Sequence, residues 1–295
     1  MGRRNSLDTR HSPARIEKPK TDGIMTLKIT NQSCTVQGNL SSEEINLDRL
    51  RSNFILKRKI RGLAGRKKLG SLWLVLHPVF YSLVYFFVLS VVRSSPNSVN
   101  IFIGISMFNI FSTSLKSGIN SVGDFTGGIK GERVRTSVIS HSLLQYRVVD
   151  ILLQSSAVSA LLLLFLGIDI IGVLSYIVLC LIIGITAELF ALNFSLVVRR
   201  IPDLSNFIDY FVMLMFFGSP VLYPLSITEG LHYKINTYNP FTFFVEASRE
   251  VAGIENTLSG FFGLEQAVLL SIIFLLGIRG YFTLDKLRWE VSSWS

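Results

Sequence analysis

Residues 170–187 read Ile-Ile-Gly-Val-Leu-Ser-Tyr-Ile-Val-Leu-Cys-Leu-Ile-Ile-Gly-Ile-Thr-Ala, an apolar stretch with no charged side chain. A helix needs about 18 to 20 such residues to cross the roughly 30 Å of hydrocarbon in a bilayer. Similar uncharged stretches recur at residues 69–92, 94–115, 151–168 and 210–228, and residues 260–284 carry only two charges. The sequence therefore predicts an all-α membrane protein with six transmembrane helices.

The composition supports membrane insertion. Of the 295 residues, 17% are charged and 49% are hydrophobic, whereas soluble domains carry about 25% charged residues. Buried helices of a large soluble protein are the alternative, but those seldom run to this length without a polar face. Cys34 and Cys180 are the only cysteines. Because one falls in a polar segment and the other in a predicted span, we expect no disulfide between them.

The chain divides into four predicted segments. Residues 1–44 form a polar, weakly ordered cytoplasmic extension with one short strand over residues 25–30, and residues 45–68 form an amphipathic helix. Residues 69–285 form the six-helix transmembrane domain, and residues 286–295 form a cytoplasmic tail. Of the 29 lysines and arginines, 16 precede Leu69. Because basic residues stay on the cytoplasmic side, this asymmetry places both termini inside the cell.

The amphipathic helix follows a capping signal in which Glu44 comes three residues after Ser41. Apolar residues then recur at roughly helical spacing with basic residues between them. We interpret this segment as a helix lying on the membrane, its basic side toward anionic headgroups. Packing on a protein is the alternative. The net charge of +9 therefore reflects membrane topology, and we expect contact with membrane lipids and not with nucleic acid.

A break and a new helix are predicted between the fifth and sixth spans. Pro220 and Pro224 interrupt the fifth helix, and Asn239-Pro240 suits a helix start with Asn as N-cap and Pro in the first turn. We expect two short re-entrant helices on the outer side. The second is a candidate gate helix with an apolar side and an i,i+3 ion pair; its candidate residues are Asn239, Pro240, Phe241, Phe244, Glu246 and Arg249.

An aromatic stripe marks the first predicted span. Trp73, His77, Tyr81 and Tyr85 are spaced four residues apart, so they lie along one face of a helix. Aromatic rings suit the apolar face of a sugar, and we expect this stripe, with Tyr223, to line a substrate channel. The alternatives are an interfacial aromatic belt for Trp73 and ordinary packing for the others.

Charged residues also occur where a membrane domain tolerates few of them. Asp150 follows Arg147 by three residues, which favours a local ion pair. Glu188 has no such neighbour in its helix. Its carboxyl group either faces a cavity or another subunit, or is buried and protonated, and the sequence leaves both alternatives open. The inner connection after the second span suits docking of a partner, although a solvated loop is the alternative; its charged residues are Asp124, Lys130, Glu132, Arg133 and Arg135.

Enzyme signatures are missing from the sequence. Gly127-Gly128-Ile129-Lys130-Gly131 lacks the spacing and the hydroxyl residue of a nucleotide-binding loop. No Ser/His/Asp or Cys/His arrangement suggests a catalytic site, and the four scattered histidines suggest no metal site. We expect the chain to be no enzyme and to bind no cofactor by itself.

Four motifs in order resemble the permease subunits of ABC polysaccharide exporters, which move lipid-linked O-antigen, capsule or teichoic acid chains. The resemblance covers residues 50–285. The motifs are Leu69-Gly-Ser-Leu-Trp73 with Pro78, Arg200-Ile-Pro-Asp203, Ser219-Pro-Val-Leu-Tyr-Pro224, and Asn239-Pro240 followed by Glu246 and Arg249. The first 40 residues have no counterpart, and the inner connection lacks the family's Phe-Pro.

The resemblance implies a homodimer in the bacterial cytoplasmic membrane, docked on two cytoplasmic ATP-binding subunits that bind ATP and magnesium. It also implies that the inner connection couples the two kinds of subunit and that the substrate is a lipid-linked polysaccharide. An ABC efflux permease for a drug or small lipid is the alternative in the same superfamily. A membrane-embedded transferase and a proton-coupled carrier that uses Asp150 and Glu188 are alternatives from other classes.

Overall fold

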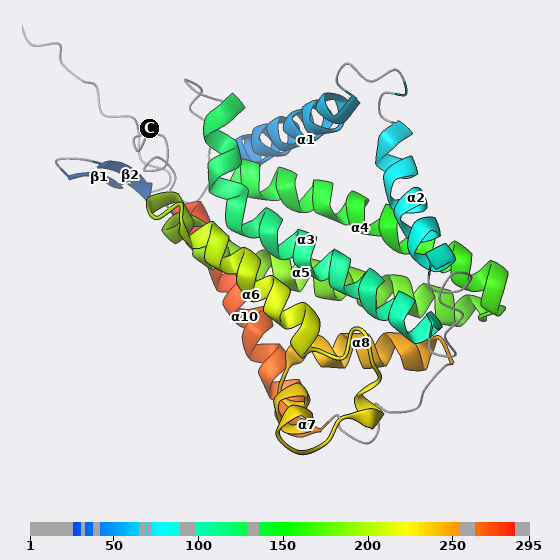
Figure 1. The fold of residues 1–295 in the computed structure, drawn as a ribbon. Coiled ribbons are helices and arrows are strands. Elements are labelled where there is room, and N and C mark those ends of the chain that lie inside the picture. The colour runs from blue at the N-terminus through cyan, green and yellow to red at the C-terminus, as the bar shows by residue number, and fades with distance from the viewer. Residues whose placement is uncertain are drawn as a thin grey trace, which may run out of the picture.

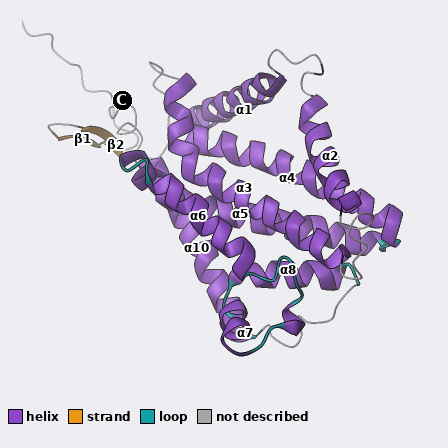
Figure 2. Ribbon diagram, viewed as in Figure 1, coloured by secondary structure: helices purple, strands orange, loops and turns teal. Residues whose placement is uncertain are grey.

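The computed structural model describes residues 26–30, 33–37, 42–64, 69, 72–88, 98–128, 136–253 and 263–286. Over these residues the chain is mainly helical (Figures 1 and 2). Four of the described helices are long and apolar enough to cross a membrane. Three of them have 31 residues each and the last has 23; they are α3 (Ser98–Gly128), α4 (Thr136–Leu166), α5 (Ile170–Arg200) and α10 (Leu264–Lys286).

Helix α5 is the centre of the membrane domain, because α3, α4 and α10 all pack against it. A tight turn joins α4 to α5. Gly167 has a φ of 63°, a left-handed conformation that glycine adopts without steric cost. Asp169 then caps α5 by accepting a hydrogen bond of 2.8 Å from the Ile170 backbone N–H. These two residues explain why the chain reverses direction within so few residues.

Two apolar helices are shorter. Helices α2 (Trp73–Phe87) and α6 (Leu204–Gly218) have 15 residues each, about 22 Å at 1.5 Å per residue. They fall where the first and fifth spans are predicted, but each is shorter than the roughly 30 Å of hydrocarbon. Helix α6 stops before Pro220, which lacks a backbone N–H. The count of six spans therefore stays a prediction.

Helix α1 (Ser42–Ala64) corresponds to the predicted amphipathic helix. It packs against α4, across which it lies in Figure 1. Ser52 donates a hydrogen bond of 3.2 Å to Gln145, and the Gln145 amide donates one of 3.3 Å to Asn53. Leu50 and Phe54 point away from this contact and stay exposed. One side of α1 therefore packs on protein, while its exposed apolar side is compatible with the predicted membrane surface.

The N-terminal extension contains more regular structure than expected. Strand β1 (Thr26–Thr30) matches the predicted strand, and it pairs antiparallel with β2 (Ser33–Gln37), which the sequence analysis missed. The β-branched residues Thr35 and Val36 favour a strand there. The rest of residues 1–41 lies outside the described part of the chain.

The segment between α6 and α10 folds back on itself. It contains a 3-10 turn (Leu225–Ile227), helix α7 (Gly230–Thr237) and helix α8 (Pro240–Val251). The predicted start of α8 is confirmed, because the Asn239 side chain accepts a hydrogen bond of 3.0 Å from the Phe241 backbone N–H. Whether α7 and α8 enter the outer leaflet stays a prediction.

The α3–α5 contact depends on a glycine. A Cβ atom added to Gly118 would lie 2.4 Å from the Glu188 carbonyl oxygen on α5, so Gly118→Ala must push the two helices apart. We expect a loss of about 1–3 kcal/mol in the free energy of unfolding and a lower melting temperature in detergent. Gly62→Ala on α1, where nothing lies within 4 Å, is the control and should leave the melting temperature unchanged or higher. Equal melting temperatures for both variants would contradict the close approach.

Candidate functional site

Helix α8 carries a buried ion pair. Arg249 and Glu246 are both fully buried, and Arg249 Nη1 lies 2.7 Å from Glu246 Oε1. The pair therefore has the i,i+3 spacing expected from the sequence. Its neighbours Phe241 and Phe244 are buried too, so α8 is covered on both its apolar and its charged side. The predicted pair is therefore buried in protein, and the role of α8 as a gate stays a prediction.

The guanidinium of Arg249 also holds distant backbone in place. Its Nε and Nη2 donate to the Asn100 carbonyl oxygen at 3.3 and 3.2 Å, which ties α8 to the first turn of α3. It donates in addition to the carbonyl oxygens of Val221 and Tyr223, at 3.2 and 3.3 Å. Glu246 accepts a hydrogen bond of 3.3 Å from the Leu225 backbone N–H. The ion pair thus fixes the Val221–Leu225 segment between α3 and α8.

Tyr223 belongs to the same outer segment. Its hydroxyl oxygen lies 2.8 Å from His232 Nε2 and 3.2 Å from the Gly218 carbonyl oxygen, to which it donates. Partial burial raises the pKa of this phenol. Tyr223 therefore links α7 to the end of α6, and the structure does not bring it together with the tyrosines of α2.

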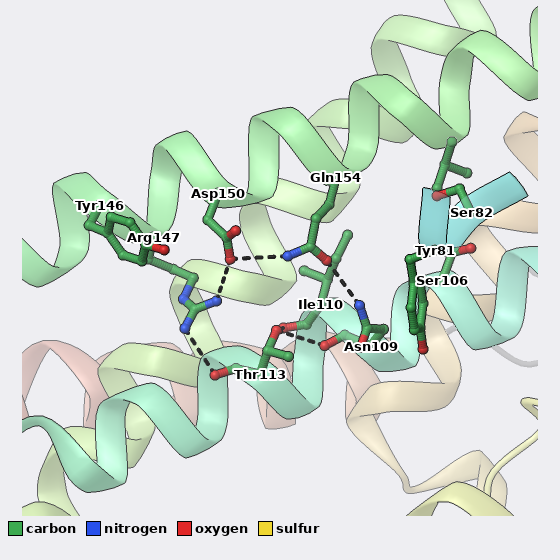
Figure 3. A pocket seen from close by; sticks show the side chains of 11 residues that line it. Tyr81, Ser82, Ser106, Asn109, Ile110, Thr113, Tyr146, Arg147, Asp150 and Gln154 are labelled. Atoms are coloured by element: carbon green, nitrogen blue, oxygen red, sulfur yellow. Dashed lines mark hydrogen bonds and ion pairs between the residues drawn. The ribbon is translucent and has the colours of Figure 1, made fainter. Parts of the chain in front are cut away.

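A second site is a polar cavity of about 300 Å³ between α2, α3 and α4 (Figure 3). Its walls are unusual for a membrane domain because nine of its eleven lining residues carry a hydroxyl, amide or charged group. The lining residues are Tyr81, Ser82, Ser106, Asn109, Ile110, Thr113, Tyr146, Arg147, Asp150, Gln154 and Val158.

Side chains from α3 and α4 form a continuous hydrogen-bond network along the cavity (Figure 3). Arg147 lies 2.7 Å from Asp150, and its Nη2 donates to the Thr113 carbonyl oxygen at 3.1 Å. Gln154 donates to Asp150 at 3.0 Å and accepts from Asn109 at 3.0 Å. The local ion pair expected from the sequence is present, and it is one part of a larger network.

Glu188 finds its partner on another helix. Its carboxylate is 1% exposed and lies 3.3 Å from Arg147 Nε, while Ser117 donates to it at 3.4 Å. Arg147 therefore stands between two carboxylates, one on its own helix and one on α5. Such an arrangement lowers the cost of holding three charged groups at this depth.

The aromatic stripe divides between the cavity and the core. Tyr81 lines the cavity and lies against Tyr85, with ring centroids 4.6 Å apart. Tyr85 packs against the hydrophobic core and Trp73 is partly buried at the start of α2. The side chain of His77 lies outside the described part of the structure. Of the predicted channel residues, Tyr81 alone is among those described as lining the cavity.

A model of the ABC-2 type transporter family matches residues 53–252, which is more than half of the chain. The chain belongs to the ABC-2 type transporter family. Membrane domains of this family work with ATP-binding subunits, so this ABC-2 chain is a transmembrane component of an ABC transporter. A comparison with curated proteins finds no match.

The coupling region of this ABC-2 chain is only partly described. Asp124 lies on α3 near its end, but its side chain is outside the described part of the structure. Lys130, Glu132, Arg133 and Arg135 lie outside it altogether. Their contact with an ATP-binding subunit stays a prediction.

The ABC-2 domain also has an apolar cavity of about 470 Å³ bounded by α3, α5, α6, α8 and α10. Phe111, Phe190 and Met215 are among its lining residues, and the start of α8 closes one side. This cavity and the one between α2, α3 and α4 are therefore opposite in character, one apolar and one polar.

The buried pair on α8 makes a testable prediction. Arg249→Ala strands the Glu246 carboxylate and leaves three carbonyl groups without their donor, so we expect a loss of about 3–5 kcal/mol in stability. Removing Glu246 as well should restore only part of this loss, because the carbonyl groups still lack a donor. Thermal unfolding in detergent measures both variants.

Arg200→Ala at the exposed end of α5 is the control for this measurement, and we expect it to change stability by no more than about 0.5 kcal/mol. If Arg249→Ala unfolds at the same temperature as this control, the pair does not stabilise the outer segment.

Proposed function

We propose that this chain is the transmembrane subunit of an ATP-driven exporter for a lipid-linked polysaccharide of the O-antigen, capsule or teichoic acid type. The observation that carries the proposal is the polar cavity, in which Tyr81 faces the network of Asn109, Gln154 and Asp150. A tyrosine ring can stack on the apolar face of a pyranose, and amide and carboxylate groups can bind its hydroxyls. This combination suits a sugar better than an apolar substrate.

The proposed assembly is a homodimer with two cytoplasmic ATP-binding subunits, which would bind ATP and magnesium. Helix α6 has a row of exposed apolar side chains that includes Phe207, Phe211 and Leu214. A second copy of the chain is one partner that could cover such a face in the membrane. We infer that movement of the ATP-binding subunits reaches the membrane domain through the inner connection of residues 124–135.

The proposed topology has six spans, both termini in the cytoplasm of a bacterium, and α7 and α8 dipping into the outer leaflet. Helix α2 and helix α6 supply the two shorter spans, and the uncharged stretches around them are longer than the helices themselves. In this arrangement α8 is an outer gate whose position is set by Arg249 and Glu246.

A second candidate function is efflux of a drug or small lipid. The apolar cavity favours it, because its 470 Å³ falls within the roughly 300–1,000 Å³ typical of small-molecule sites. The two candidates differ in what they need: a polymer needs the polar cavity, whereas an apolar molecule needs the space around Phe111 and Met215.

Single cysteines test the topology. In a background with Cys34→Ser and Cys180→Ala, Lys234→Cys on α7 should react with an impermeant thiol reagent added to intact cells. Arg51→Cys on α1 should react only after the cells are opened, since α1 is proposed to lie inside. Labelling of Arg51→Cys in intact cells would reverse the orientation.

Export variants test the substrate. Tyr81→Ala should lower the polymer displayed at the cell surface by about tenfold, the scale of about 1.4 kcal/mol for a lost aromatic contact, while Tyr81→Phe keeps most of it. Tyr233→Ala, at an exposed position on α7, is the control. The readouts are surface polymer and drug susceptibility; unchanged polymer with raised drug susceptibility would favour the second candidate.

A further inference from the structure

We propose that the polar cavity binds an uncharged sugar unit and discriminates against units that carry a phosphate, a carboxylate or an ammonium group. This inference rests on the proposed function in so far as the exported polymer reaches the cavity. It goes further by naming the chemistry of the repeat unit, which the proposed function leaves open among O-antigen, capsule and teichoic acid types.

The first observation is the charge balance of the cavity walls. Arg147 and Asp150 are the only charged residues among those described as lining it, and they lie 2.7 Å apart. These two opposite charges cancel, so the described walls carry no net charge with which to attract an ion.

The second observation is that several polar groups of the cavity wall have hydrogen-bond acceptors left for a ligand. Ser106 donates its hydroxyl to the Phe102 carbonyl oxygen at 2.8 Å, and Thr113 donates to that of Asn109 at 2.7 Å. Only lone pairs of these hydroxyls remain for a ligand. Asp150 uses Oδ2 for Arg147 and Gln154, and no described residue donates to its Oδ1.

These acceptors match sugar hydroxyls, because a hydroxyl can donate to Asp150 Oδ1 and still accept from a neighbour. A phosphate or carboxylate has no proton to donate to the same atoms. Its cationic partner among the described lining residues would be Arg147, but that guanidinium already contacts Asp150, Glu188 and the Thr113 carbonyl oxygen. An anion would therefore lose its water without gaining a free cation.

An ammonium group finds acceptors but no uncompensated negative charge, because Arg147 neutralises Asp150. No ion pair then offsets the free-energy cost of removing its water. An uncharged, hydroxylated ring avoids both penalties. Tyr81, whose ring is held against Tyr85, provides an aromatic surface beside the acceptors in Figure 3.

Binding of three tetrasaccharides tests the inference. The full chain in lipid nanodiscs is titrated with maltotetraose, tetragalacturonate and chitotetraose, which are neutral, anionic and cationic, and saturation-transfer NMR gives each Kd. We expect maltotetraose to bind about tenfold or more tightly than either charged ligand, because the charged ligands lose hydration without compensation.

Two variants change the balance of charge in opposite directions. Asp150→Asn leaves Arg147 with an excess positive charge beside the cavity and should shift the preference toward tetragalacturonate. Asn109→Asp adds a negative charge and should shift it toward chitotetraose. Asn120→Asp makes the same substitution on the exposed side of the same helix, away from the cavity, and should leave the order of affinities unchanged.

The inference is overturned if the wild-type chain shows no saturable binding of maltotetraose, if it prefers a charged ligand, or if Asn109→Asp and Asn120→Asp behave alike. If one variant does not fold, the other still reports a shift of preference. These failures differ from failure of the proposed function. A chain that exports an anionic polymer keeps its function and loses this inference, whereas a drug exporter that binds maltotetraose keeps the binding site and loses the polymer.

Discussion

A buried arginine needs acceptors close to its guanidinium, and in this chain two such arginines organise the two candidate sites. Arg249 reaches one carboxylate and three backbone carbonyl oxygens, so α3, α8 and the Val221–Leu225 segment are held by one side chain. Arg147 does the same in the membrane domain with two carboxylates and one carbonyl oxygen. The positions of α3, α5 and α8 therefore depend on the acceptors that these two guanidinium groups contact. Apolar side chains pack around these contacts.

Local features were the predictable ones. The start of α8 followed from Asn239-Pro240, because capping is decided by adjacent residues, and the Glu246–Arg249 pair followed from spacing on one helix. Asn100 could not be foreseen as a partner of Arg249, since 149 residues separate them. The same holds for Glu188, whose partner Arg147 lies on α4. The burial of α8 could not be predicted either, because burial depends on neighbours that periodicity does not reveal.

Two residues of the polar cavity could have been predicted from the sequence. Tyr81 was identified from its four-residue spacing, whereas Asn109 and Gln154 were not singled out. Both are amides within apolar spans, and such residues usually bond across helices. Their mutual bond of 3.0 Å is of that kind. Tyr223 lies with His232 in the outer segment, away from this cavity, so its place in a channel stays a prediction.

The contact between α1 and α4 has a mechanical consequence. Gln145 and Tyr146 contact α1 through Ser52, Asn53 and Lys59, and the next residue along the chain is Arg147. A displacement of α1 therefore acts on the α4 backbone that carries Arg147, because no flexible linker separates that residue from the contact. Because Arg147 lies beside Asp150 and Glu188, electrostatic attraction between the arginine and these two residues opposes such a displacement. Helix α1 is therefore mechanically coupled to the interior of the protein.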